Sequence, residues 1–171
     1  MIRISAGRWQ RTVGADTGLL KPQAWTALVV LWLLAVPAAA ETLPVAELPI
    51  ADRTLTVEIA ATPQTMARGL MFREHLPEDH GMLFIWTQDQ VVGMWMQNTL
   101  IPLSVAFIDR EYRVLNIADM EPHSRRVHTS DGPARYAHEV NRGWFARHGV
   151  RPGTHIDGLA VMLSKLDAES D

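Results

Sequence analysis

The chain has 171 residues, a formal net charge of −3 at pH 7, 20% charged residues and no cysteine. This length supplies one domain core, and the absence of cysteine excludes disulfides and catalytic thiols. Because there is no basic excess, we expect neither nucleic acid nor an anionic membrane surface as a partner.

The first 40 residues have the pattern of a signal peptide. Four basic residues between positions 3 and 21 precede an apolar run at 24–36, and Ala38 and Ala40 fit the small-residue site of signal peptidase. We therefore predict cleavage after Ala40 and export to the periplasm or the medium. The alternative is an uncleaved inner-membrane anchor with the domain outside, because the 19 uncharged residues between Lys21 and Glu41 nearly match the roughly 20 that span a bilayer.

The remaining residues form one unit in the predicted organisation. We expect 41–51 to be an extended lead-in, 52–166 to be a single β-domain and 167–171 to be a flexible tail. The predicted leader holds four of the 16 basic and one of the 19 acidic residues, so residues 41–171 have a net charge of about −6. Without disulfides, the apolar core alone must hold this domain together.

The first half of the domain alternates strands with short turns. Apolar and polar residues alternate at 53–60, which predicts a half-buried strand. Thr62 and Pro63 predict the start of a two-turn helix that ends near Gly69. The apolar run at 81–86 predicts a buried strand, and 87–90 a turn. Further strands at 91–96 and 103–108 are predicted on either side of a turn at Asn98 and Thr99.

The second half continues in the same way. Charged residues at 109–111 predict a hairpin loop before a return strand at 112–118. A polar segment at 121–132 precedes a strand at 134–140, and Asn141 predicts the cap of a helix at 142–148. Asp157 and Gly158 predict a hairpin between strands at 154–156 and 159–163. The pattern predicts a mainly β fold, an antiparallel β-sandwich or partly closed barrel with one or two short helices.

Four phrases of the sequence carry a resemblance to a known family. They are RGLMFR at 68–73, GMLF at 81–84, MWMQNTLIP at 94–102 followed by FID at 107–109, and GPARYAHE at 132–139. In this order and spacing they resemble the bacterial and archaeal family catalogued as domain of unknown function 192. The resemblance covers about residues 52–158. It implies a compact, β-rich, jelly-roll-like fold, often behind a signal peptide, and it implies no reaction.

Polar and aromatic residues in these phrases are the candidates for a ligand-binding site. Trp95 can form an aromatic floor or pack in the core, and the two arginines of RGLMFR can clamp an anion or pair with a carboxylate. Asp109 can act chemically or cap its turn. The full candidate set is Arg68, Arg73, Trp95, Gln97, Asn98, Asp109, Arg135 and Glu139.

The sequence favours a function in binding. There is no GxSxG, HExxH or Gly-rich phosphate loop, so we expect no cofactor and no metal and assign no catalytic residue. The favoured function is an exported, monomeric, non-catalytic binding or accessory module of the cell envelope. Its partner would be a polar small molecule, a glycan or an envelope protein, or the membrane itself if the leader stays uncleaved.

Two other functions are compatible with the same residues. One is a hydrolase-type enzyme that uses Asp109 with His138 or Glu139, with or without the assistance of a metal ion. It requires these groups to lie within hydrogen-bonding distance in one cleft, with perturbed pKa values. The other is a purely structural envelope protein, in which the charged residues would be paired on the surface.

Overall fold

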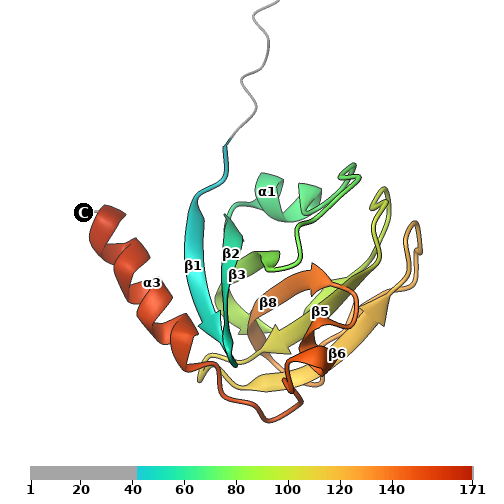
Figure 1. Cartoon of the computed structure of the whole chain (residues 1–171). Coiled ribbons are helices and arrows are strands. Elements are labelled where there is room, and N and C mark those ends of the chain that lie inside the picture. The colour runs from blue at the N-terminus through green and yellow to red at the C-terminus, as the bar shows by residue number, and fades with distance from the viewer. Residues whose placement is uncertain (1–41, 171) are drawn as a thin grey trace, which may run out of the picture. The chain divides into compact units, whose positions relative to one another are not determined.

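The computed structural model of the chain describes residues 42–170 (Figure 1). The predicted signal peptide and its cleavage site lie outside these residues. Within them, no helix is both long and apolar enough to cross a membrane. The segment 41–171 is one compact unit, and its described residues contain two apolar clusters that span residues 43–166.

The main element of the fold is a six-stranded sheet. In spatial order its strands are β1 (Val45–Ile50), β2 (Arg53–Ala60), β3 (His80–Gln90), β8 (Ala134–Asn141), β5 (Leu103–Ile108) and β6 (Val114–Met120). A small second sheet pairs β4 (Gly93–Met94) with β7 (His128–Thr129). The predicted mainly β class is confirmed. The six-stranded sheet is not closed into a barrel, because β1 and β6 lie at its opposite edges.

One strand pair departs from the antiparallel pattern. β2 and β3 are parallel, since the chain crosses between them through helix α1 (Pro63–Arg68) and the loop after it. The predicted start of α1 is confirmed. Thr62 accepts a hydrogen bond from the backbone of Thr65, and Pro63 occupies the first turn. At the other end the chain leaves the helix at Gly69, whose φ of 48° suits glycine.

The sheet buries both of its faces. All six residues of β5 are buried, and its five apolar residues alternate between two apolar clusters. One cluster contains Trp144 and Phe145 from α2 (Trp144–Arg147) and Leu159 from α3 (Asp157–Ser170). The other contains Phe84, Met96 and Phe107. β8 and β5 are therefore central strands, covered on both sides.

Several predicted boundaries in the N-terminal half were wrong. The lead-in expected at 41–51 contains β1, which pairs along its full length with β2. The turn expected at 87–90 is the end of β3, which continues to Gln90. Of the strand expected at 91–96, only the two residues of β4 form a strand, because β4 pairs only with the short β7.

The C-terminal half also needs correction. Asn141 does not cap α2 but ends β8, and its side-chain amide donates to the carbonyl oxygens of Leu76 and Pro77, each at 3.0 Å. The strand expected at 159–163 is part of helix α3, which includes the expected tail up to Ser170. The strand expected at 154–156 does not form, and His155 makes only an isolated bridge with Arg113. Figure 1 shows α3 alongside β1.

Gly158 is needed for the contact between α3 and β1. A Cβ atom at Gly158 would lie 2.0 Å from the carbonyl oxygen of Pro49. The glycine that suggested a hairpin turn instead lets the first turn of a helix approach the outermost strand closely.

Candidate functional site

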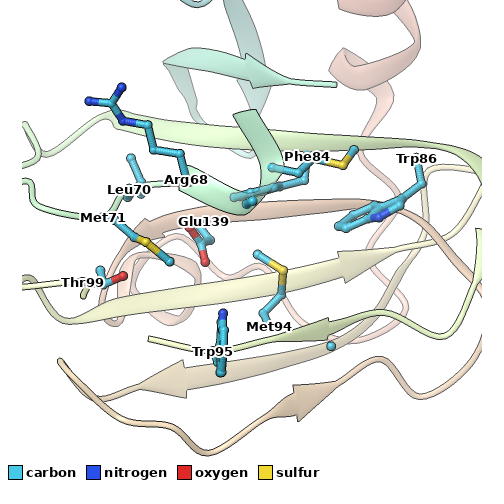
Figure 2. Close-up of a pocket in the computed structure, with 13 residues that line it drawn as sticks. Arg68, Leu70, Met71, Phe84, Trp86, Met94, Trp95, Thr99 and Glu139 are labelled. Atoms are coloured by element: carbon cyan, nitrogen blue, oxygen red, sulfur yellow. The ribbon is translucent and has the colours of Figure 1, made fainter. Parts of the chain in front are cut away.

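A cleft of about 250 Å³ opens on the Phe84 side of the sheet. Figure 2 shows the side chains that line it. They come from α1 and the turn after it, from β3, from the segment around β4, and from β8. The lining residues are Met66, Ala67, Arg68, Gly69, Leu70, Met71, Phe84, Trp86, Gly93, Met94, Trp95, Thr99 and Glu139.

All four sequence phrases that carry the family resemblance contribute to this cleft. RGLMFR supplies residues 68–71, GMLF supplies Phe84, MWMQNTLIP supplies Met94, Trp95 and Thr99, and GPARYAHE supplies Glu139. These phrases are far apart in the chain and meet here because β3 and β8 are neighbours in the sheet.

Glu139 is the polar group at the floor of the cleft. It lies on β8 between Met82 of β3 and Val105 of β5, and only 4% of the residue is exposed. Its carboxyl group makes no hydrogen bond or ion pair with any residue in the range 42–170. Burial raises the pKa of Glu139 to about 8, so the carboxyl group is protonated at neutral pH.

The walls of the cleft are rich in aromatic rings and thioethers, and the side chains of Arg68 and Thr99 also line it. The rings of Phe84 and Trp86 are stacked, with centroids 6.2 Å apart and planes inclined by 19°. Figure 2 shows the carboxyl group of Glu139 among Met71, Met94 and Phe84. A polar group in such surroundings binds strongly to whatever satisfies it, because little water competes.

The rim of the cleft exposes two large aromatic residues. Trp95 is 48% exposed, and Phe72, which follows the lining residue Met71, is 65% exposed. Phe72 also has a φ of 64°, a left-handed conformation that is strained for a side chain of this size. Its backbone N–H donates to the carbonyl oxygen of Asn98, which ties the RGLMFR turn to the WMQNT turn.

Three of the eight candidate residues line the cleft: Arg68, Trp95 and Glu139. Arg68 is exposed, and in Figure 2 its guanidinium group points away from the other labelled side chains. Trp95 lies at the rim and is not a core residue. These three residues therefore form the part of the predicted site that the fold brings together.

Both of the other candidate arginines are paired with carboxylates outside the cleft. Arg73 forms a two-pronged ion pair with Glu58 of β2, in which Nη2 lies 2.6 Å from Oε2. This hydrogen bonding raises the pKa of Arg73. Arg135 Nε lies 2.6 Å from Asp89 Oδ1. The pairing partners were not identifiable from spacing, since Glu58 and Asp89 lie on other strands.

The remaining three candidates lie around turns. Asn98 has a φ of 59° and shapes the WMQNT turn, as expected for a residue that tolerates the left-handed region. Asp109 accepts a hydrogen bond from the backbone N–H of Arg113 at 2.8 Å and so closes the β5–β6 hairpin. Gln97 is half-buried and does not line the cleft.

The structure does not bring together the three residues of the hydrolase alternative. His138 and Glu139 are consecutive on β8 and project to opposite faces of the sheet, where His138 packs its ring edge-to-face on Phe145. Asp109 follows Ile108, which pairs with Tyr136, whereas Glu139 pairs with Val105. Asp109 is thus about four residues along the sheet from Glu139, or roughly 13 Å.

His138 is buried on the side of the sheet away from the cleft. It is fully buried, and neither ring nitrogen has a hydrogen-bond partner among residues 42–170. Burial lowers the pKa of His138 to about 3, so the ring is neutral. In the same range, no three His, Cys, Asp or Glu side chains are grouped closely enough to hold a metal ion.

The lining residues that sequence reasoning missed are mostly apolar. Met66, Met71 and Phe84 were expected in a helix stripe, a loop and a core strand, and Trp86 in a buried strand. Their position within the family phrases, or directly beside them, was the available signal. Apolar periodicity does not distinguish the wall of a cleft from the interior of a core.

Comparison with known proteins identifies the family. The model of the DUF192 family, described as "Uncharacterized ACR, COG1430", matches residues 46–158. This match covers more than half of the chain and confirms the resemblance predicted from the four phrases. No curated protein matches the chain.

Solved structures with the same fold come from two bacteria. A candidate transcription regulator from Sinorhizobium meliloti 1021 is 38% identical, with a TM-score of 0.61 over 67% of this chain and 92% of that one. A protein of unknown function from Novosphingobium aromaticivorans DSM 12444 is 35% identical, with a TM-score of 0.59 over 64% of this chain and 80% of that one.

Proposed function

The chain belongs to the DUF192 family of uncharacterised proteins, and from this premise we propose that it is a non-catalytic binding module of the cell envelope. Its binding site is the cleft with Glu139 at the floor and Trp95 at the rim. The observation that carries the proposal is the convergence of all four family phrases on this one cleft.

The chemistry of the cleft supports binding more than catalysis. Glu139 and Arg68 are the two ionisable residues that line it, and the guanidinium group of Arg68 points away. A general acid–base reaction needs a second group that can exchange a proton near the reacting atoms. A single protonated carboxyl group between aromatic walls instead suits recognition of a polar group on an apolar body.

Location and partners complete the proposal. Export rests on the signal-peptide pattern of residues 1–40. The net charge of about −6 in residues 41–171 supports the proposal that nucleic acid is not a partner. The module acts as a monomer, and its ligand is a small molecule, because a cleft of about 250 Å³ is near the lower end of the range for small-molecule sites.

A thermal-shift screen tests the proposed function. The protein is expressed with its own leader, purified in the form that the cell produces, and melted with neutral, anionic and amine fragments. A ligand at a hundredfold excess over its dissociation constant adds about 2.7 kcal/mol to the free energy of unfolding. We expect at least one fragment to raise the melting temperature.

Two variants show whether a hit occupies the cleft. Trp95→Ala removes a rim residue and should abolish the shift. Val127→Ala is the matched control, because Val127 is 55% exposed and does not line the cleft. A shift that survives Trp95→Ala, or a screen in which no fragment class binds, would refute the proposed function.

A further inference from the structure

The unpartnered carboxyl group of Glu139 indicates what kind of ligand the cleft takes. A carboxyl group with 4% residue exposure and no protein partner leaves its hydrogen-bonding capacity for a molecule in the cleft. When ionised, both oxygens accept only. The group complementary to this ionised form is a hydrogen-bond donor, and a positively charged donor gains most from a buried carboxylate.

The side chains of the cleft walls also favour a positively charged ligand. Phe84, Trp86 and Trp95 present aromatic rings, which attract a cation through their faces. The thioethers of Met71 and Met94 are polarisable and tolerate a cation and an apolar chain equally well. Arg68 is the other charged residue of the lining, and its guanidinium group points away from the cleft, so it leaves the floor free of positive charge.

The volume limits the size of the ligand. A cleft of about 250 Å³ lies near the lower end of the roughly 300–1,000 Å³ that is usual for small-molecule sites. This space accommodates an ammonium group with one short alkyl or aryl substituent. A cleft of this size favours a small organic molecule over a nucleotide or an oligosaccharide, most of which would lie outside it.

We propose that the cleft binds a small primary amine in its protonated form, with the ammonium group on Glu139 and the apolar body against Phe84, Trp86 and Trp95. This inference rests on the proposed function, because it names the ligand class of the same cleft. A primary amine is preferred to a quaternary one because only N–H groups can satisfy the two carboxylate oxygens.

Binding of this ligand displaces a proton from Glu139. The empty site holds the carboxyl proton at neutral pH, whereas the ammonium complex requires the carboxylate, so one proton goes to solvent for each amine bound. The other ionisable lining residue, Arg68, directs its guanidinium group away from the cleft. The dissociation constant should therefore fall about tenfold for each unit of pH between 6 and 8.

Calorimetric titration with three matched compounds tests the inference on the unmodified protein. The compounds are 2-phenylethylammonium, 2-phenylethanol and the N,N,N-trimethyl derivative of the amine. We expect the primary amine to bind at least tenfold more tightly at pH 8 than either of the other two. Equal or tighter binding of the alcohol or the quaternary compound would overturn the inference.

Two variants locate the interaction. Glu139→Gln keeps the size of the side chain and removes its charge, and we expect it to weaken amine binding at least tenfold and to abolish the pH dependence. Glu121→Gln changes an exposed carboxylate outside the cleft and serves as the control. Unchanged amine affinity in Glu139→Gln would also overturn the inference.

Failure of the inference is distinguishable from failure of the proposed function. If neutral or anionic fragments bind in a Trp95-dependent way and amines do not, the cleft is a binding site for another ligand class. If no compound of any class binds, both the amine inference and the proposed function fail.

Discussion

Replacing Glu139 with glutamine should change how the stability of the protein depends on pH. The pKa of Glu139 is about 8 in the folded protein and 4.5 when the group is freely solvated. Between these values the unfolded chain releases the proton and the folded chain keeps it. The stability that the protonated group contributes is therefore fully present below pH 4.5 and is lost as the pH rises to about 8.

The size of the effect follows from the difference between the two pKa values. Each unit of pH in this window costs about 1.4 kcal/mol, which reaches an upper limit of about 5 kcal/mol at pH 8. Because the side chain is almost completely buried, solvent screening removes little of this. Glutamine cannot ionise, so the free energy of unfolding of Glu139→Gln does not fall in this way as the pH rises.

The difference between the two proteins isolates this group. His138 has the opposite dependence, since its pKa is lowered to about 3, and its contribution is lost as the pH falls from 6.5. His138 and the exposed groups are common to the wild type and Glu139→Gln, so they cancel when one free energy of unfolding is subtracted from the other.

Urea denaturation followed by circular dichroism at pH values from 4.5 to 8.5 measures this difference. We expect the stability of the wild type relative to Glu139→Gln to fall by about 1.4 kcal/mol per unit of pH across the window. A difference that does not vary with pH would mean that Glu139 ionises normally, and would refute the description of the cleft floor as a buried, neutral carboxyl group.

Three further predictions concern other parts of the molecule. Gly158→Ala should destabilise the protein by about 2–4 kcal/mol, because the new methyl group collides with Pro49; an unchanged denaturation midpoint would contradict this contact. Arg73→Lys should lower the free energy of unfolding by about 1 kcal/mol, because one of the two hydrogen bonds to Glu58 is lost. A double-mutant cycle with Glu58→Gln should give an interaction energy of similar size between the two residues. The intact mass of the exported protein should correspond to cleavage after Ala40, and a mass that retains residues 1–40 would support the anchor.

Local patterns predicted most of the strands and failed where a segment is fixed by a distant part of the chain, as at Gly158. The alternation at 53–60 and the apolar run at 103–108 depend only on which face is buried, so they were readable from the sequence. Gly158 was interpreted as a turn residue, but its role is set by Pro49, a residue roughly one hundred positions away. Close approach between distant backbones leaves no signal in the local sequence.

The site was predictable at the level of segments and not of side chains. The four family phrases indicated which segments meet, and Glu139, Trp95 and Arg68 came from them. Arg73 and Arg68 look alike in the sequence, and only the position of Glu58 on a neighbouring strand separates a structural ion pair from a cleft residue. His138 and Glu139 likewise needed the strand register before they could be assigned to opposite faces.

The contact between β1 and α3 has a consequence for biosynthesis. Synthesis delivers a chain with its N-terminus first, so β1 emerges long before the residues of α3 exist. Until then the outermost strand lacks its helix and is open to pairing with strands of other nascent chains. Completion of the fold requires this late, non-local contact, and contacts of this kind are expected to slow folding.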